Sequence, residues 1–144
     1  IDIAQAAAQQ LQEIGINCTV DIPAQIDWGG QMACLIGWGS PFDADDHTYK
    51  VFGTDKGANY SSYSNEKVDK YLTLARQYED QETRAKYYDL FQEELAKDPA
   101  YAFICYIDAN YVADSDIKGI SEKTVLGHHG VGIFWNIQEW EIVK

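Results

Sequence analysis

The sequence predicts an α/β domain with a mixed sheet flanked by helices and a helical hairpin in the middle of the chain. An amphipathic helical pattern opens the chain and passes directly into an alternating strand pattern at 16–22, which is half of a βαβ unit. The runs 32–38 and 101–107 are apolar on both faces, as in central strands. Two consecutive amphipathic patterns, at 65–78 and 80–97, predict the hairpin.

The first predicted helix runs to about residue 14, and Gly15 stands where a C-terminal cap is expected. Its apolar residues share one helical face: Ile3, Ala4, Ala7, Ala8, Leu11 and Ile14. The alternating strand that follows ends before Pro23, and the segment from there to Gln31 is a predicted loop.

The hairpin is predicted to begin at a Ser64 or Asn65 cap, to turn between Tyr78 and Asp80, and to end before Pro99. Its expected buried residues are Val68, Tyr71, Leu72, Ala75, Ala85, Tyr88, Leu90, Phe91 and Leu95. We interpret its charged residues as a solvated face: Arg76, Glu79, Asp80, Glu82, Arg84 and Lys86.

Shorter elements complete the prediction. A short helix is expected at 46–52, followed by a long exposed connection at 53–64. Four short strands are expected near the C-terminus, at 110–113, 117–120, 133–135 and 140–143. We treat residues 1–144 as a single domain.

Composition excludes several classes of protein. The 23 acidic and 11 basic residues give a formal net charge of −12, without the basic cluster that nucleic acid or an anionic membrane requires. No apolar stretch reaches the length of a membrane span. Three cysteines, Cys18, Cys34 and Cys105, lie in predicted strands, where we expect buried free thiols, although one disulfide stays possible.

The segment from Leu35 to His47 is the main candidate site, because a buried strand ends there in Gly, Trp, Pro and three acids. Ligands gather where strands end in α/β sheets, so a Trp followed by carboxylates favours a ligand-contact loop. The alternative is a turn in which Asp43 caps the next helix. Both interpretations fit the local sequence.

Enzymatic motifs are absent: the sequence contains no GxSxG, no GxxxxGK[ST], no GxGxxG after a strand and no HExxH. We therefore expect neither an enzyme nor a resident metal or cofactor. An acid/base pair of Asp43 and His47 in a small hydrolase is the enzymatic alternative. His128 and His129 are sequence neighbours, and a regular strand cannot direct both at one ion.

The order of these segments resembles the peptide-, dipeptide- and nickel-binding proteins of ABC importers, solute-binding protein family 5. The residues that carry the resemblance are Ala6–Ile16, Leu35–Asp43, Asn59–Asn65, Val68-Asp69, Ala75-Arg76, Asp80, Arg84, Tyr87, Gln92, Asp98-Pro99 and Ile117–Ile120. They cover nearly the whole chain in the order found in the family.

The resemblance implies a type II periplasmic-binding-protein-like lobe, the C-terminal one of two lobes that close on a ligand. The N-terminal lobe of the same protein and a transporter permease are then the expected partners. The implied location is extracytoplasmic, either in a periplasm or lipid-anchored on the outer face of the cytoplasmic membrane. The implied ligand-contact residues are Trp38, Gly39, Ser40, Asp43, Asp45 and His47.

The resemblance implies an oligopeptide or dipeptide as ligand, with an acid such as Asp43 meeting the α-amine. Ser40-Pro41 stands where many dipeptide binders have an Asp, which is closer to the nickel-binder loops and to some peptide-binder loops. A nickel or other metal chelate, or another solute of the same family, is the alternative ligand. A module outside transport, whose Tyr- and Trp-rich surface docks another protein, is the alternative function.

Overall fold

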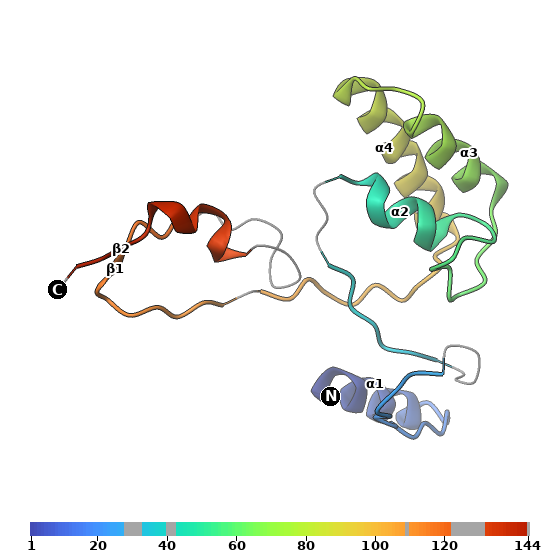
Figure 1. Ribbon diagram of the computed structural model, residues 1–144. Coiled ribbons are helices and arrows are strands. Elements are labelled where there is room, and N and C mark those ends of the chain that lie inside the picture. The colour runs from blue at the N-terminus through green and yellow to red at the C-terminus, as the bar shows by residue number, and fades with distance from the viewer. Residues whose placement is uncertain (28–32, 40–42, 109, 122–131, 144) are drawn as a thin grey trace. The chain divides into compact units, whose positions relative to one another are not determined.

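A computed structural model describes residues 1–27, 33–39, 43–108, 110–121 and 132–143 (Figure 1). Two compact units, residues 1–37 and 38–144, are described separately. The helices are α1 (Asp2–Glu13), α2 (Asp45–Phe52), α3 (Glu66–Ala75), α4 (Gln81–Lys97) and the 3₁₀ helix η2 (Ile133–Glu139), and the strands are β1 (Ile117–Lys118) and β2 (Glu141–Ile142). None of the described helices is both long and apolar enough to cross a membrane.

Helix α1 ends as predicted, because Gly15 adopts a φ of +87° that other residues rarely adopt. The Gly15 N–H donates to the Gln12 carbonyl at 3.0 Å, and the Ile16 N–H donates to the Leu11 carbonyl at 2.9 Å. These two hydrogen bonds form a Schellman motif, which satisfies carbonyls that the helix end leaves free.

The predicted hairpin is confirmed, and side-chain caps start both of its helices. The Asn65 side chain accepts hydrogen bonds from the N–H groups of Lys67 and Val68, and the Asp80 side chain accepts one from Thr83. Helix α3 ends at Ala75, three residues before the predicted turn at Tyr78. The short helix predicted at 46–52 is α2.

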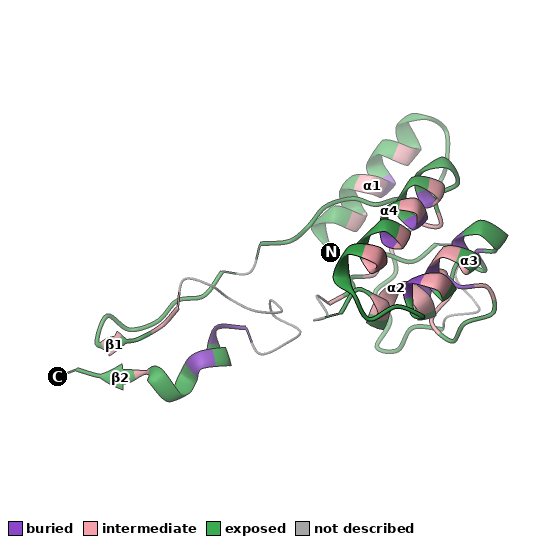
Figure 2. Ribbon diagram, turned by 90° about the horizontal axis from the view of Figure 1, so that it is seen from above, coloured by how far each residue is buried: buried purple, intermediate pink, exposed green. Residues whose placement is uncertain are grey.

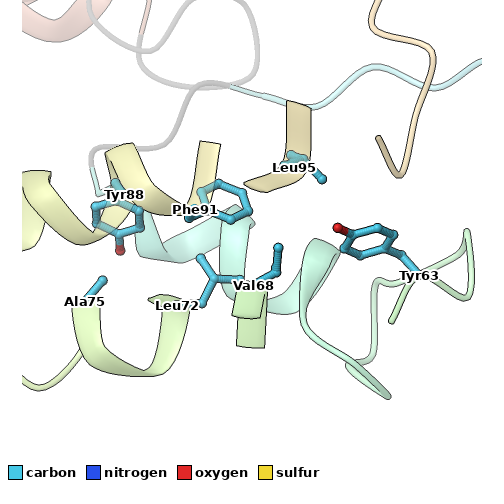
Figure 3. Packing of buried hydrophobic residues seen from close by; sticks show 7 residues of the cluster. All are labelled: Tyr63, Val68, Leu72, Ala75, Tyr88, Phe91 and Leu95. Carbon is cyan, nitrogen blue, oxygen red and sulfur yellow. The ribbon is translucent and has the colours of Figure 1, made fainter. Parts of the chain in front are cut away.

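Most of the buried apolar residues lie in and around the hairpin (Figure 2). The core cluster comprises Tyr63, Val68, Leu72, Ala75, Tyr88, Phe91 and Leu95, with side chains of α3 and α4 directed toward one another (Figure 3). Tyr49 and Phe52 of α2 pack against this cluster. The hairpin and α2 thus share one core.

One predicted core residue is wrong, because Ala85 is exposed. Ala75, the last residue of α3, lies beside Tyr88 of α4 (Figure 3). Ala85 lies about one helical turn before Tyr88 and therefore beyond the end of α3, where α3 offers no side chain to cover it.

The predicted mixed sheet is wrong for the part of the chain that the structure describes. The paired strands there are β1 and β2, which run antiparallel with Ile117 opposite Ile142. The predicted strand at 133–135 lies in η2 instead, where the buried Asn136 side chain donates to the Gly119 carbonyl at 2.9 Å. This hydrogen bond favours a compact turn over an extended strand.

The described parts of the predicted strands 16–22, 32–38, 101–107 and 110–113 are not paired in a sheet. A strand requires ladder hydrogen bonds to a neighbour, and an apolar run by itself does not supply that neighbour. Large apolar residues of these segments are consequently exposed, among them Leu35 and Phe103. Cys34 and Cys105 are exposed as well, contrary to prediction, while Cys18 is half-buried, and all three thiols are free.

Candidate functional site

The structure places five of the six candidate residues near the start of α2. Trp38 and Gly39 precede it, Asp43 lies two residues before its first residue Asp45, and His47 lies in its first turn. Ser40 lies outside the described residues.

Trp38 is the centre of an aromatic group, here called the Trp38 cluster, with His47 and Tyr60. The His47 ring meets Trp38 edge-on, with centroids 5.4 Å apart and planes at 78°. Tyr60 lies parallel to Trp38, with centroids 6.2 Å apart and planes at 7°. Trp38 stays 37% exposed and Tyr60 43% exposed, so both rings retain surface for a ligand.

Asn59 organises the loop that carries Tyr60. Its side-chain amide donates to the carbonyls of Gly53 (2.9 Å) and Tyr63 (2.7 Å), and its Oδ1 accepts the Tyr63 N–H at 3.0 Å. One half-buried amide therefore joins the two ends of the loop and fixes the segment around Tyr60.

Asp43 is bound by two groups of the protein. Its Oδ1 accepts the Asp45 N–H at 2.8 Å, and both carboxylate oxygens accept hydrogen bonds from the Arg84 guanidinium, at 2.6 and 2.9 Å. Arg84, and then the Asp45 N–H, hold the pKa of Asp43 below its usual value. Asp43 in turn raises the pKa of Arg84. Asp43 thus binds the first N–H of α2 and forms a bidentate ion pair, although the N-cap residue is Ala44, which makes no side-chain capping hydrogen bond.

Asp45 forms a second ion pair with the hairpin, because its Oδ2 lies 3.2 Å from Arg76 Nε. The Arg76 guanidinium also lies over the Tyr49 ring, 4.0 Å from its centroid. The other oxygen, Asp45 Oδ1, is buried and has no hydrogen-bond partner among the described residues. This oxygen is shielded from solvent, and a buried acceptor without a partner costs free energy.

Sequence reasoning missed the ion pairs that Arg76 and Arg84 form with the candidate loop. Arg76 is exposed, as a solvated face predicts, whereas the Arg84 side chain is only 23% exposed. Each arginine pairs with an acid of the candidate loop. The available signal was charge complementarity between a loop with three closely spaced acids and a hairpin with two arginines at its turn. Tyr60 was also missed, since nothing local connects it to Trp38.

Metal ligation is not indicated by the described residues, in which no three His, Cys, Asp or Glu side chains are grouped to hold an ion. Asp46 contacts Lys50, which holds the pKa of the Asp46 carboxyl below its usual value. The Asp46 carboxylate also lies 3.2 Å from His47 Nδ1. His128 and His129 lie outside the described residues.

Comparison with solved structures finds NikZ from Campylobacter jejuni, determined in complex with Ni(L-His). The two chains are 35% identical, with a TM-score of 0.77 over 98% of this chain. The match covers 30% of NikZ, so this chain spans less than a third of that protein's length. This similarity supports the solute-binding-protein resemblance of the sequence. No family model matches the chain. No curated protein matches it either.

Proposed function

We propose that this chain is part of an extracytoplasmic solute-binding protein that delivers its ligand to an ABC transporter permease. The observation that carries this proposal is the 35% identity to NikZ across 98% of the chain. NikZ was determined with a small solute bound, and the sequence resembles the same family of importers. The proposed location is a periplasm or a lipid-anchored position outside the cytoplasmic membrane, and an N-terminal lobe of the same protein completes the ligand cleft.

The proposed ligand wall is the segment that begins at Trp38 and continues into α2. It comprises Trp38, Gly39, Ser40, Asp43, Asp45 and His47, to which the structure adds Tyr60 as a neighbour of Trp38. Capture of a solute requires partly exposed aromatic surface and a few oriented polar groups, without a nucleophile. The Trp38 cluster supplies the aromatic surface, and the two carboxylates supply the polar groups.

An oligopeptide or dipeptide is the proposed ligand, with its α-amine at Asp43. A carboxylate offers about four lone-pair sites, and Arg84 with the Asp45 N–H occupies three of them. The remaining site belongs to Oδ2, and the Asp43 side chain is 51% exposed. Asp43 therefore has room for one more donor.

A nickel chelate is the second candidate ligand, and the Ni(L-His) complex of NikZ is the observation that favours it. An imidazole or another flat chelating group suits the exposed Trp38 and Tyr60 rings. A chelate arrives with part of its coordination shell filled, so it does not require three clustered protein ligands.

A thermal-shift screen of the full-length protein tests the proposal, with di- to hexapeptides, nickel with L-histidine, and oligosaccharides as probes. A ligand that binds only the folded state raises the melting temperature by mass action. We expect a rise with peptides that Asp43→Ala reduces. A rise with nickel–histidine alone contradicts peptide binding, and the absence of a rise with every class contradicts solute binding.

A further inference from the structure

Two arginines at the turn of the α3–α4 hairpin reach the same short segment of chain. Arg76 follows the last residue of α3, and Arg84 lies in the first turn of α4. They pair with Asp45 and Asp43, which lie on either side of the position where α2 begins. The start of α2 is therefore attached to the hairpin at two points.

The two attachments differ in strength and geometry. The Arg84 pair is bidentate, and the Arg84 side chain is only 23% exposed, while it also lies over the Tyr88 ring of the core. A planar guanidinium held in this way fixes both the distance and the orientation of its carboxylate. The Arg76 pair is a single contact, supplemented by the Tyr49 ring of α2.

The Trp38 cluster depends on the same helix start. His47 is the third residue of α2, and its ring makes the edge contact with Trp38. A shift of the first turn of α2 displaces His47 and removes this support. Tyr60, the other ring that contacts Trp38, is placed by the Asn59 loop, which is hydrogen-bonded to the end of α2 through the Lys50 and Gly53 carbonyls and not to its start. The arginines are thus coupled to one of the two aromatic contacts that Trp38 makes among the described residues.

We propose that Arg84, assisted by Arg76, is a positioning residue that sets the placement of Trp38 through Asp43, the start of α2 and His47. Arg84 acts on bound solute through this chain of contacts rather than by touching it. The effect on ligand affinity rests on the proposed function, whereas the effect on Trp38 does not.

The test is ¹⁹F NMR of the full-length protein labelled with 5-fluorotryptophan, in which the Trp38 resonance is the one that Trp38→Phe removes. We expect Arg84→Ala to shift or split this resonance and to leave the other tryptophan resonances unchanged. Arg84→Lys keeps the charge without the planar fork, so it should restore the resonance only in part.

Lys86→Ala is the matched control, since Lys86 is an exposed cation two residues along α4. A merely structural role for Arg84 predicts a lower melting temperature with all tryptophan resonances changed together, and no selective rescue by Arg84→Lys. An unchanged Trp38 resonance in a folded Arg84→Ala protein overturns the proposal, as does an equal shift in Lys86→Ala.

Calorimetry with the ligand class found by the thermal-shift screen gives the functional readout. We expect Arg84→Ala to weaken binding about tenfold, within the range reported for residues that act through a network, and Lys86→Ala to leave it unchanged. Full affinity in Arg84→Ala overturns the proposed effect on binding. If the wild-type protein binds none of the probes, the proposed function fails, and the NMR result still decides the positioning role.

Discussion

Leu72→Ala tests whether the α3–α4 interface is the main core of the unit that carries the candidate site. Leu72 is 0% exposed and lies in the cluster with Phe91 and Tyr88 (Figure 3). The substitution deletes three buried carbons, which at roughly 0.8 kcal/mol each amounts to about 2.4 kcal/mol of transfer free energy. The residual cavity adds to this loss, so we expect a decrease of about 3 to 4 kcal/mol in the free energy of unfolding.

Urea denaturation followed by circular dichroism measures this loss, which should appear as a lower midpoint with an unchanged slope. Leu74→Ala on the same helix is the matched control, because Leu74 is only half-buried and should cost less than Leu72. A loss below about 1 kcal/mol for Leu72→Ala, or equal losses for both variants, would refute this description of the core.

Three further predictions concern local features. Asn65→Ala removes the acceptor of two helix N–H groups and should lower the free energy of unfolding by about 1 kcal/mol. Asn65→Asp keeps an acceptor and should largely avoid this loss. An equal loss in both variants argues against capping. Gly119→Ala should destabilise the protein more than Gly15→Ala, because both glycines have a positive φ but, of the two, only Gly119 would place a Cβ against the Glu139 carbonyl. Chemical denaturation of both variants measures the two losses of unfolding free energy, and equal losses refute the prediction. Asp43 has a lowered pKa in the folded protein, so its pairing stabilises the fold fully above the usual value of 3.8 and is lost as the pH falls through the lower folded value. Asp43→Asn should therefore be less stable than wild type at neutral pH and converge with it in acid, and a gap that persists in acid contradicts the ion pair.

The helices could be predicted because their signals are local. Gly15 ends α1, while Asn65 and Asp80 start α3 and α4, each through hydrogen bonds to residues within five positions. The strand predictions were wrong because a strand requires a neighbouring strand to pair with, and an apolar run does not identify that neighbour. The strand predicted at 133–135 was wrong because the following residue, Asn136, favours a turn through its hydrogen bond to the Gly119 carbonyl, 17 residues earlier.

The same distinction between local and long-range contacts applies to the candidate site. Trp38 and His47 were predicted from one continuous segment, and their rings are in contact. The pairing of Arg84 with Asp43 was not predicted, because 41 residues separate the two and the charge of Arg84 was equally consistent with a solvated helix face. The parallel placement of Tyr60 on Trp38 likewise depends on the fold of the Asn59 loop.

Calorimetric titration of full-length Trp38→Ala and Trp135→Ala measures whether the segment at Trp38 binds the ligand. The two tryptophans are similarly exposed, 37% and 41%, but only Trp38 lies in the proposed ligand wall. We expect a peptide or nickel–histidine ligand that the wild type binds to lose most of its affinity in Trp38→Ala and to retain it in Trp135→Ala. Wild-type affinity in Trp38→Ala would contradict a ligand wall at this segment.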